Sequence, residues 1–211
     1  MKLRYKRIPL TVVLIIFFTI TGCSGSKKII PKADYHLLTG RKITPHTKRG
    51  IKNESNTLLI GKRLKFTLAA TDSVTMYPSG NKKIYSNYKE LFANVNPNTN
   101  YKVTIHTLPD THMSTNKYVF IPIADVFDKL NAKLEITTVE NKWANDFEKP
   151  GIKGIFTFNS GNSDEIAIVV AANNKEVNKK LYTYIINFIT FKYWASTRGD
   201  FYITIEEIKE K

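Results

Sequence analysis

The chain contains a single cysteine, Cys23, among its 211 residues. A disulfide within the chain needs two thiols, so a disulfide-stapled fold is excluded and stability must come from a packed core. Three sequence patterns of enzymes are also missing, namely a GxSxG nucleophile elbow, a GxGxxG loop after a strand and a P-loop. We therefore expect a protein that is not an enzyme and needs no cofactor.

The N-terminus lacks an apolar run long enough to span a bilayer. Residues 8–21, IPLTVVLIIFFTIT, carry no charge, but a membrane-spanning helix needs about 20 apolar residues. A secretory signal peptide needs an apolar core of only about 7–15 residues after a basic start. The preceding MKLRYKR has four basic and no acidic residues. The segment is therefore interpreted as a signal peptide, with an uncleaved anchor helix as the alternative.

The apolar run ends in Ile20, Thr21, Gly22 and Cys23. This quartet resembles the lipobox of bacterial lipoproteins, in which a branched apolar residue, a small residue and glycine or alanine precede an invariant cysteine. The resemblance covers residues 1–23 only. It implies cleavage between Gly22 and Cys23, a diacylglycerol on the Cys23 sulfur and often an acyl group on its new amino terminus.

This resemblance also implies a location. We expect the protein to be lipid-anchored on the extracytoplasmic face of the cell membrane. The alternative is the periplasmic side of an outer membrane, since Ser24 follows the cysteine where an aspartate would favour retention at the inner membrane.

Acidic residues are few, 18 against 32 basic ones, and the imbalance is greatest just after Cys23. Residues 24–55 hold eight basic residues against two acidic ones. Such a stretch gains on the order of 1 kcal/mol per positive charge beside anionic headgroups, or it only keeps a tether solvated. The expected membrane-surface residues are Lys27, Lys28, Lys32, Arg41, Lys42, Lys48, Arg49 and Lys52.

Composition divides the chain into three parts. We expect residues 1–22 to be the signal peptide, residues 23–55 a basic and flexible tether, and residues 56–211 a single globular domain; the cleavage of the first part and the lipid on the second are what the lipobox resemblance implies. The tether has few large apolar residues and so cannot bury enough surface to offset the entropy of ordering. The remaining residues are enough for one core.

Alternating or β-branched apolar residues predict most of the domain to be strands. Residues 166–172 are apolar throughout, which is typical of a strand covered on both faces. Residues 159–163, NSGNS, predict a hairpin turn. The predicted strands are residues 56–70, a hairpin over 74–86, then 101–108, 118–121, 133–139, 154–158, 165–171 and 201–211.

Helices are predicted at residues 86–95, with Ser86 as the cap, at 124–130, and at 175–194. The last is the longest, and it has one helical stripe of apolar residues, Leu181, Ile185, Phe188 and Ile189. We therefore expect an α+β domain in which an antiparallel or mixed sheet carries this long helix on one face.

Few residues are candidates for a metal or ligand site. His106, Asp110 and His112 could converge on a divalent metal, because imidazole and carboxylate are metal ligands. The alternative, which we favour, is two solvated loop histidines and no metal. A set of aromatic residues could line a groove, although core packing is their commoner use: Tyr182, Tyr184, Phe188, Phe191, Tyr193 and Trp194.

Three functions remain open at this point. The preferred one is a lipid-anchored, non-enzymatic module that binds another protein of the cell envelope. The second is a carrier or sensor of a small ligand, and the third is a metal-dependent envelope hydrolase. No nucleic-acid partner is expected, since the chain has no interleaved aromatic and basic stripe. The oligomeric state is left open.

Overall fold

β-strands make up nearly all of the regular structure. The computed structural model describes residues 37–38, 40–41, 50–79, 82–111, 114–144 and 150–209. Within these ranges the only helical segments longer than two residues are the 3₁₀ turns η1 (Glu54–Asn56) and η2 (Asn174–Glu176). None of the described helices is both long and apolar enough to cross a membrane.

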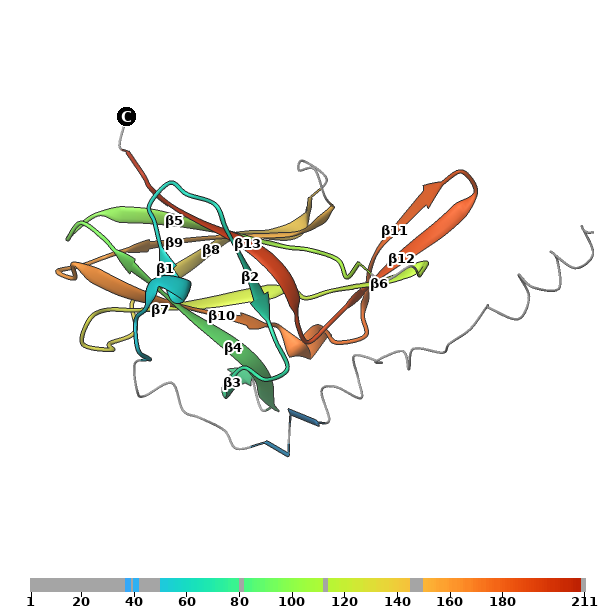
Figure 1. Cartoon of the computed structure of the whole chain (residues 1–211), viewed down its shortest axis with the longest axis horizontal. Coiled ribbons are helices and arrows are strands. Elements are labelled where there is room, and N and C mark those ends of the chain that lie inside the picture. The colour runs from blue at the N-terminus through green and yellow to red at the C-terminus, as the bar shows by residue number, and fades with distance from the viewer. Residues whose placement is uncertain are drawn as a thin grey trace, which may run out of the picture. The chain divides into compact units, whose positions relative to one another are not determined.

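Two five-stranded sheets lie face to face in the described residues (Figure 1). The first has the order β1-β4-β10-β7, with β3 also paired to β4. Its strands are β1 (Thr57–Leu58), β3 (Val74–Ser79), β4 (Lys82–Asn94), β7 (Pro122–Phe127) and β10 (Glu165–Ala172). The second has the order β2-β13-β5-β9-β8. Its strands are β2 (Leu64–Leu68), β5 (Asn100–Thr107), β8 (Ile136–Ala144), β9 (Gly151–Asn159) and β13 (Gly199–Glu207).

The core fills the space between these sheets. Alternate residues of β5 and β13, such as Val103 and Ile203, point inward and meet Leu91 of β4 and Ile168 of β10 in one cluster. Successive strand side chains face opposite sides of a sheet, so this alternation gives each sheet one apolar face. Strand β10 is buried at every position after Glu165, as the run of apolar residues predicted.

A third, three-stranded sheet extends from the sandwich. It consists of β11 (Lys180–Ile186), β12 (Ile189–Ala195) and β6 (Asn116–Val119), in the order β11-β12-β6. β11 and β12 form an antiparallel hairpin, and β12 pairs in parallel with β6. Because β6 leads into β7 and β12 leads into β13, this sheet is joined to both layers of the sandwich (Figure 1).

The predicted α+β class and its long helix at residues 175–194 are wrong. Those residues form η2 and the β11–β12 hairpin, which turns at Asn187 and Phe188, both with positive φ. Positive φ at two successive turn residues is the geometry of the tightest hairpins. The segment is rich in aromatic and β-branched residues, which fit a pleated sheet better than a helix.

The two shorter predicted helices are also strands. Residues 86–95 fall mostly in β4, and residues 124–130 overlap β7. Ser86, expected as a helix cap, is buried between strands, where its hydroxyl accepts the backbone N–H of Ala172 at 3.0 Å. In β7 the side chains of Ala124 and Val126 alternate inward, which is strand periodicity.

The expected hairpin at residues 159–163 is an arch between the two sheets. β9 pairs with β5 and β8, whereas β10 pairs with β4 and β7. Buried Ser160 fixes the arch, because its hydroxyl donates to the carbonyl of Asn96 at 2.7 Å and accepts the N–H of Thr99 at 3.0 Å. The hairpin at 74–86 and the strand at 101–108 are confirmed, and the closing strand predicted from residue 201 is present but ends at Glu207.

Gly151 lies where the chain enters β9 against β5. A Cβ at this position would be 2.0 Å from the carbonyl oxygen of Thr107 and 2.7 Å from Nε2 of His106. We expect Gly151→Ala to lower the free energy of unfolding by about 1–3 kcal/mol, because overpacking forces the backbone to shift. Gly40→Ala is the control, since no atom lies within 4 Å of its added Cβ. Equal urea midpoints for the two variants would contradict this packing.

Candidate functional site

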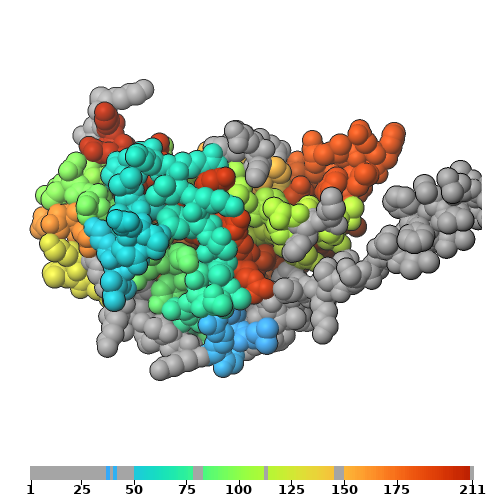
Figure 2. All heavy atoms as spheres, viewed as in Figure 1, coloured from blue at the N-terminus to red at the C-terminus, as the bar shows by residue number. Residues whose placement is uncertain are grey.

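An aromatic groove runs along one face of the β11–β12 hairpin. It has a volume of about 400 Å³, within the range of small-ligand sites. Its walls come from the hairpin, from β6, from the end of β8 and from Pro150, which immediately precedes β9. The lining residues are Lys117, Trp143, Pro150, Tyr182, Tyr184, Ile186, Phe191 and Tyr193. The hairpin, in orange and red, stands out at one end of the sandwich (Figures 1 and 2).

The strand register gathers the hairpin's aromatic side chains on this face. Residues directly opposite each other in an antiparallel pair lie on the same side of the sheet. The opposite pairs are Tyr182 with Tyr193, Tyr184 with Phe191, and Ile186 with Ile189. β6 adds Lys117 to the same face, because it lies opposite Tyr193.

Trp143 of β8 joins the hairpin to the sandwich. Its ring is stacked on Tyr182 with centroids 4.6 Å apart and an angle of 14° between the planes. It also meets Tyr193 edge-on, again at 4.6 Å. Aromatic pairs of these kinds contribute about 0.5–1.5 kcal/mol each beyond the area that they bury. The stack therefore fixes the inner end of the groove and leaves its outer half, at Tyr184 and Ile186, open to solvent.

The groove is apolar with one cation at its edge. Burial raises the pKa of the Tyr193 phenol, and the neighbouring Tyr184 and Tyr182 raise it further. Its phenol is therefore neutral at physiological pH. None of the described lining residues is a carboxylate, histidine, cysteine or serine. The arrangement suits the binding of a flat apolar or aromatic group, and Lys117 places a positive charge at the edge of the groove.

Only part of this site was visible in the sequence. Of the aromatic set named above, Tyr182, Tyr184, Phe191 and Tyr193 do line the groove. Phe188 is at the hairpin's turn, and Trp194 donates its indole N–H to Oδ1 of Asn116 at 3.3 Å. Trp143 and Lys117 were missed, because no spacing in the sequence connects them to the hairpin.

The proposed metal ligands occupy different surroundings. His106 is in β5 with only 2% of its surface exposed, so it is not the solvated histidine that we favoured. Its Nδ1 lies 3.5 Å from Nη2 of Arg63, and Lys153 is its cross-strand neighbour on β9. The Arg63 guanidinium in turn sits 3.9 Å from the ring centroid of Tyr202. These two basic neighbours, Arg63 and Lys153, make the surroundings of His106 unfavourable for a metal cation.

Asp110 is tied to the start of β6. Its Oδ1 accepts the backbone N–H of Tyr118 at 3.2 Å, and its own N–H donates to the Tyr118 carbonyl at 2.9 Å. His112 lies outside the described residues. Within the described part of the chain, no three His, Cys, Asp or Glu residues are grouped to hold a metal ion.

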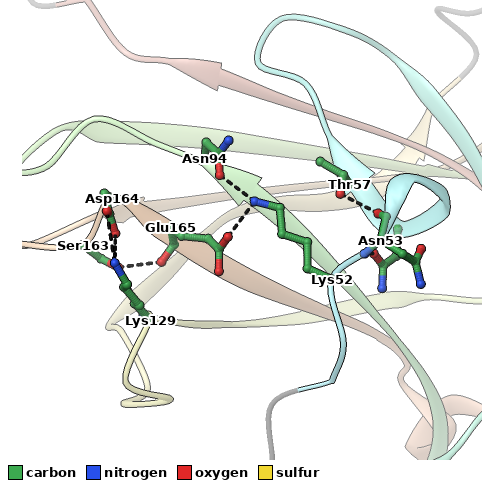
Figure 3. Close-up of polar contacts among 9 residues, drawn as sticks. Lys52, Asn53, Thr57, Asn94, Lys129, Ser163, Asp164 and Glu165 are labelled. Carbon is green, nitrogen blue, oxygen red and sulfur yellow. Dashed lines mark hydrogen bonds and ion pairs between the residues drawn. The ribbon is translucent and has the colours of Figure 1, made fainter.

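Two of the basic residues expected at the membrane are described. Lys52 is held on the edge of the sandwich, where its Nζ lies 2.6 Å from both Oδ1 of Asn94 and Oε2 of Glu165 (Figure 3). Arg41 donates to the carbonyl oxygen of Ala70. The predicted cleavage and lipid-attachment residues, Gly22 and Cys23, lie outside the described residues, as do Lys27, Lys28, Lys32, Lys42, Lys48 and Arg49.

Comparisons with known proteins leave the family of this chain open. No protein-family model, no curated protein and no solved structure matches it. The function must therefore be argued from the groove and the hairpin themselves.

Proposed function

We propose that the protein is a lipid-anchored, extracytoplasmic binding module without enzymatic activity, and that the aromatic groove receives a segment of another envelope protein. The observation that carries this proposal is the groove itself, an apolar surface of aromatic side chains left open at its outer end. Aromatic residues dominate the energetics of protein interfaces, where a few of them in a desolvated pocket supply most of the affinity.

The strand β11 supports a particular mode of binding. It is at the end of its sheet and pairs with β12 alone among the described strands. An exposed edge strand has a row of backbone N–H and C=O groups that an extended peptide can pair with. A peptide added along β11 would place alternate side chains on the face that carries Tyr184 and Ile186.

The charge near the groove indicates the partner's chemistry. Lys117 lines the groove and Lys180 lies at the start of β11, whereas Lys192 is opposite Thr183 and so faces away from the groove. Basic side chains around an apolar site favour an acidic partner and speed its association. The proposed partner segment is therefore extended, with aromatic or aliphatic residues beside acidic ones.

A small-ligand carrier remains the second candidate, and the volume of the groove favours it. About 400 Å³ is enough for a compact organic molecule. Native mass spectrometry of the full chain distinguishes the two functions. A carrier would retain a small molecule of constant mass, and that molecule would be lost on Tyr184→Ser.

The proposed anchor has its own test. We expect cells that express the wild-type chain to incorporate radiolabelled palmitate into it, and Cys23→Ala to abolish the label, because Cys23 is the only thiol of the chain. Ser24→Ala is a matched control that leaves the cysteine in place. Equal labelling of the wild type and Cys23→Ala would overturn the anchor.

The proposed partner is tested by photo-crosslinking in intact cells. A benzoylphenylalanine at Tyr184 should yield a discrete adduct with one envelope protein, because Tyr184 lines the open part of the groove. The same group at Val139, which is exposed on β8 of the sandwich, is the control and should yield none.

A further variant tests whether the crosslink depends on the groove. With the photo-reactive group at Tyr184, Phe191→Ser should weaken the adduct by tenfold or more, on the order expected for loss of one buried aromatic contact. Recovery of only lipid and self-adducts, or identical adducts from Tyr184 and Val139, would contradict the proposal.

A further inference from the structure

The turn of the β11–β12 hairpin has apolar side chains exposed on all sides. Ile185 is 64% exposed and Phe188 fully exposed, and Ile186 and Ile189 are about half exposed. Soluble proteins scatter single apolar residues over their surfaces, whereas a contiguous exposed group marks a contact with a partner or a membrane. We call Ile185, Ile186, Asn187, Phe188 and Ile189 the tip.

The backbone of the tip is strained at the turn where Phe188 is exposed. Asn187 and Phe188 have φ angles of 45° and 66°. Asparagine accepts the left-handed region readily, but a bulky residue there is a strained exception, and glycine is the usual occupant. The ring of Phe188 is fully exposed, so its burial within the chain does not offset the backbone strain. Strain of this kind at a surface points to an external role.

Side chains change in character along the hairpin. At the tip they are aliphatic and phenyl groups. Tyr184 and Phe191 form the next aromatic pair, and Lys192 and then Lys180 lie farther from the turn. At about 3.3 Å per residue, the tip reaches roughly 10 Å beyond Lys192. Membrane-interface elements bury apolar groups about 5–10 Å deep, with aromatic residues at the headgroups and lysines at the surface.

The charge of the hairpin indicates which kind of membrane surface it would contact. The hairpin strands, residues 180–195, contain Lys180 and Lys192 and no acidic residue, whereas the preceding Lys179 is ion-paired with Glu176 at 2.9 Å. Each positive charge near an anionic bilayer contributes on the order of tenfold or less to the affinity, within a Debye length. The hairpin is therefore complementary to anionic lipid headgroups.

A bilayer fits the tip better than a protein pocket. Ile186 and Ile189 face the groove side of the hairpin, Ile185 faces the opposite side, and Phe188 projects at the turn. A protein pocket would have to enclose the tip from every direction, whereas a fluid hydrocarbon phase surrounds an inserted element without shape matching. We propose that the tip inserts into the interfacial layer of an anionic lipid bilayer.

Insertion would orient the protein at the membrane. Arg41, 18 residues after Cys23, is held at the carbonyl of Ala70, and a chain of that length spans at most about 60 Å when extended. A lipid on Cys23 alone therefore leaves the face of the sandwich that meets the bilayer undetermined. The inserted tip would hold the β11 edge and the groove close to the headgroups.

A single fluorescent label tests the insertion. Cys23→Ala removes the only thiol, so a cysteine introduced as Phe188→Cys in the full chain can be labelled uniquely with a nitrobenzoxadiazole dye. Leu130→Cys is the control, because Leu130 is 87% exposed in the connection between β7 and β8. Both proteins share the apolar segment 8–21, so attachment through it is common to both and only the local environment of the dye differs.

The dye at position 188 should gain intensity, shift to the blue and be quenched by nitroxide-labelled acyl chains on vesicles that contain phosphatidylglycerol. The dye at position 130 should do none of these. Identical behaviour at the two positions would overturn the proposal, and equal insertion into pure phosphatidylcholine vesicles would overturn the choice of an anionic surface.

A second variant separates contact from stability. With the dye at Ile185→Cys, Phe188→Gly should reduce insertion on the order of tenfold or more, which is the scale for losing one buried phenyl group. The same change should leave the urea midpoint unchanged or higher, because glycine relieves the strained turn. A lower midpoint with unchanged insertion would show that Phe188 is structural. The Tyr184 crosslink in cells reports on the groove, so failure of the tip and failure of the groove are distinguishable.

Discussion

The contact of Trp143 with Tyr182, on which it stacks, and with Tyr193, which it meets edge-on, is the one on which the proposed functions depend. A two-stranded hairpin is marginal in water by itself. β6 supplies a third strand of only four residues, so the rings of Trp143, Tyr182 and Tyr193 hold the hairpin in one position against β8. That position creates the groove, and it also sets the direction in which the strained turn at Phe188 projects.

The sandwich supplies the stability that this arrangement uses. β10 is buried on both faces between β4 and β7, and Ser86 and Ser160 satisfy backbone groups inside the first sheet and at the arch between the sheets. An interior with these backbone groups paired can support a surface element that exposes apolar residues and keeps an aromatic residue at positive φ. The sandwich therefore supplies the stability, and the hairpin carries the exposed apolar residues.

The fold could be predicted from the sequence where a segment has one clear hydrophobic period, or is apolar throughout because both of its faces are buried. β5, β10 and β13 were identified by strict alternation or by a continuous apolar run. The segment 175–194 was misassigned because its apolar residues fit a stripe at helical spacing as well as strand alternation, and Phe188 stands where glycine would have indicated the turn. NSGNS at 159–163 indicates a turn, but only the pairing of β9 and β10 with other strands makes it an arch. Trp143 and Lys117 reach the groove through tertiary structure alone.

Hydrogen–deuterium exchange in Trp143→Ala tests most directly whether the aromatic stack organises the hairpin. Exchange reports the free energy of local opening, amide by amide. We predict that the amides of β11 and β12 lose most of their protection in this variant, while those of β10 and β5 keep theirs. Unchanged protection across the hairpin, or an equal loss in β10 and β12, would contradict the account.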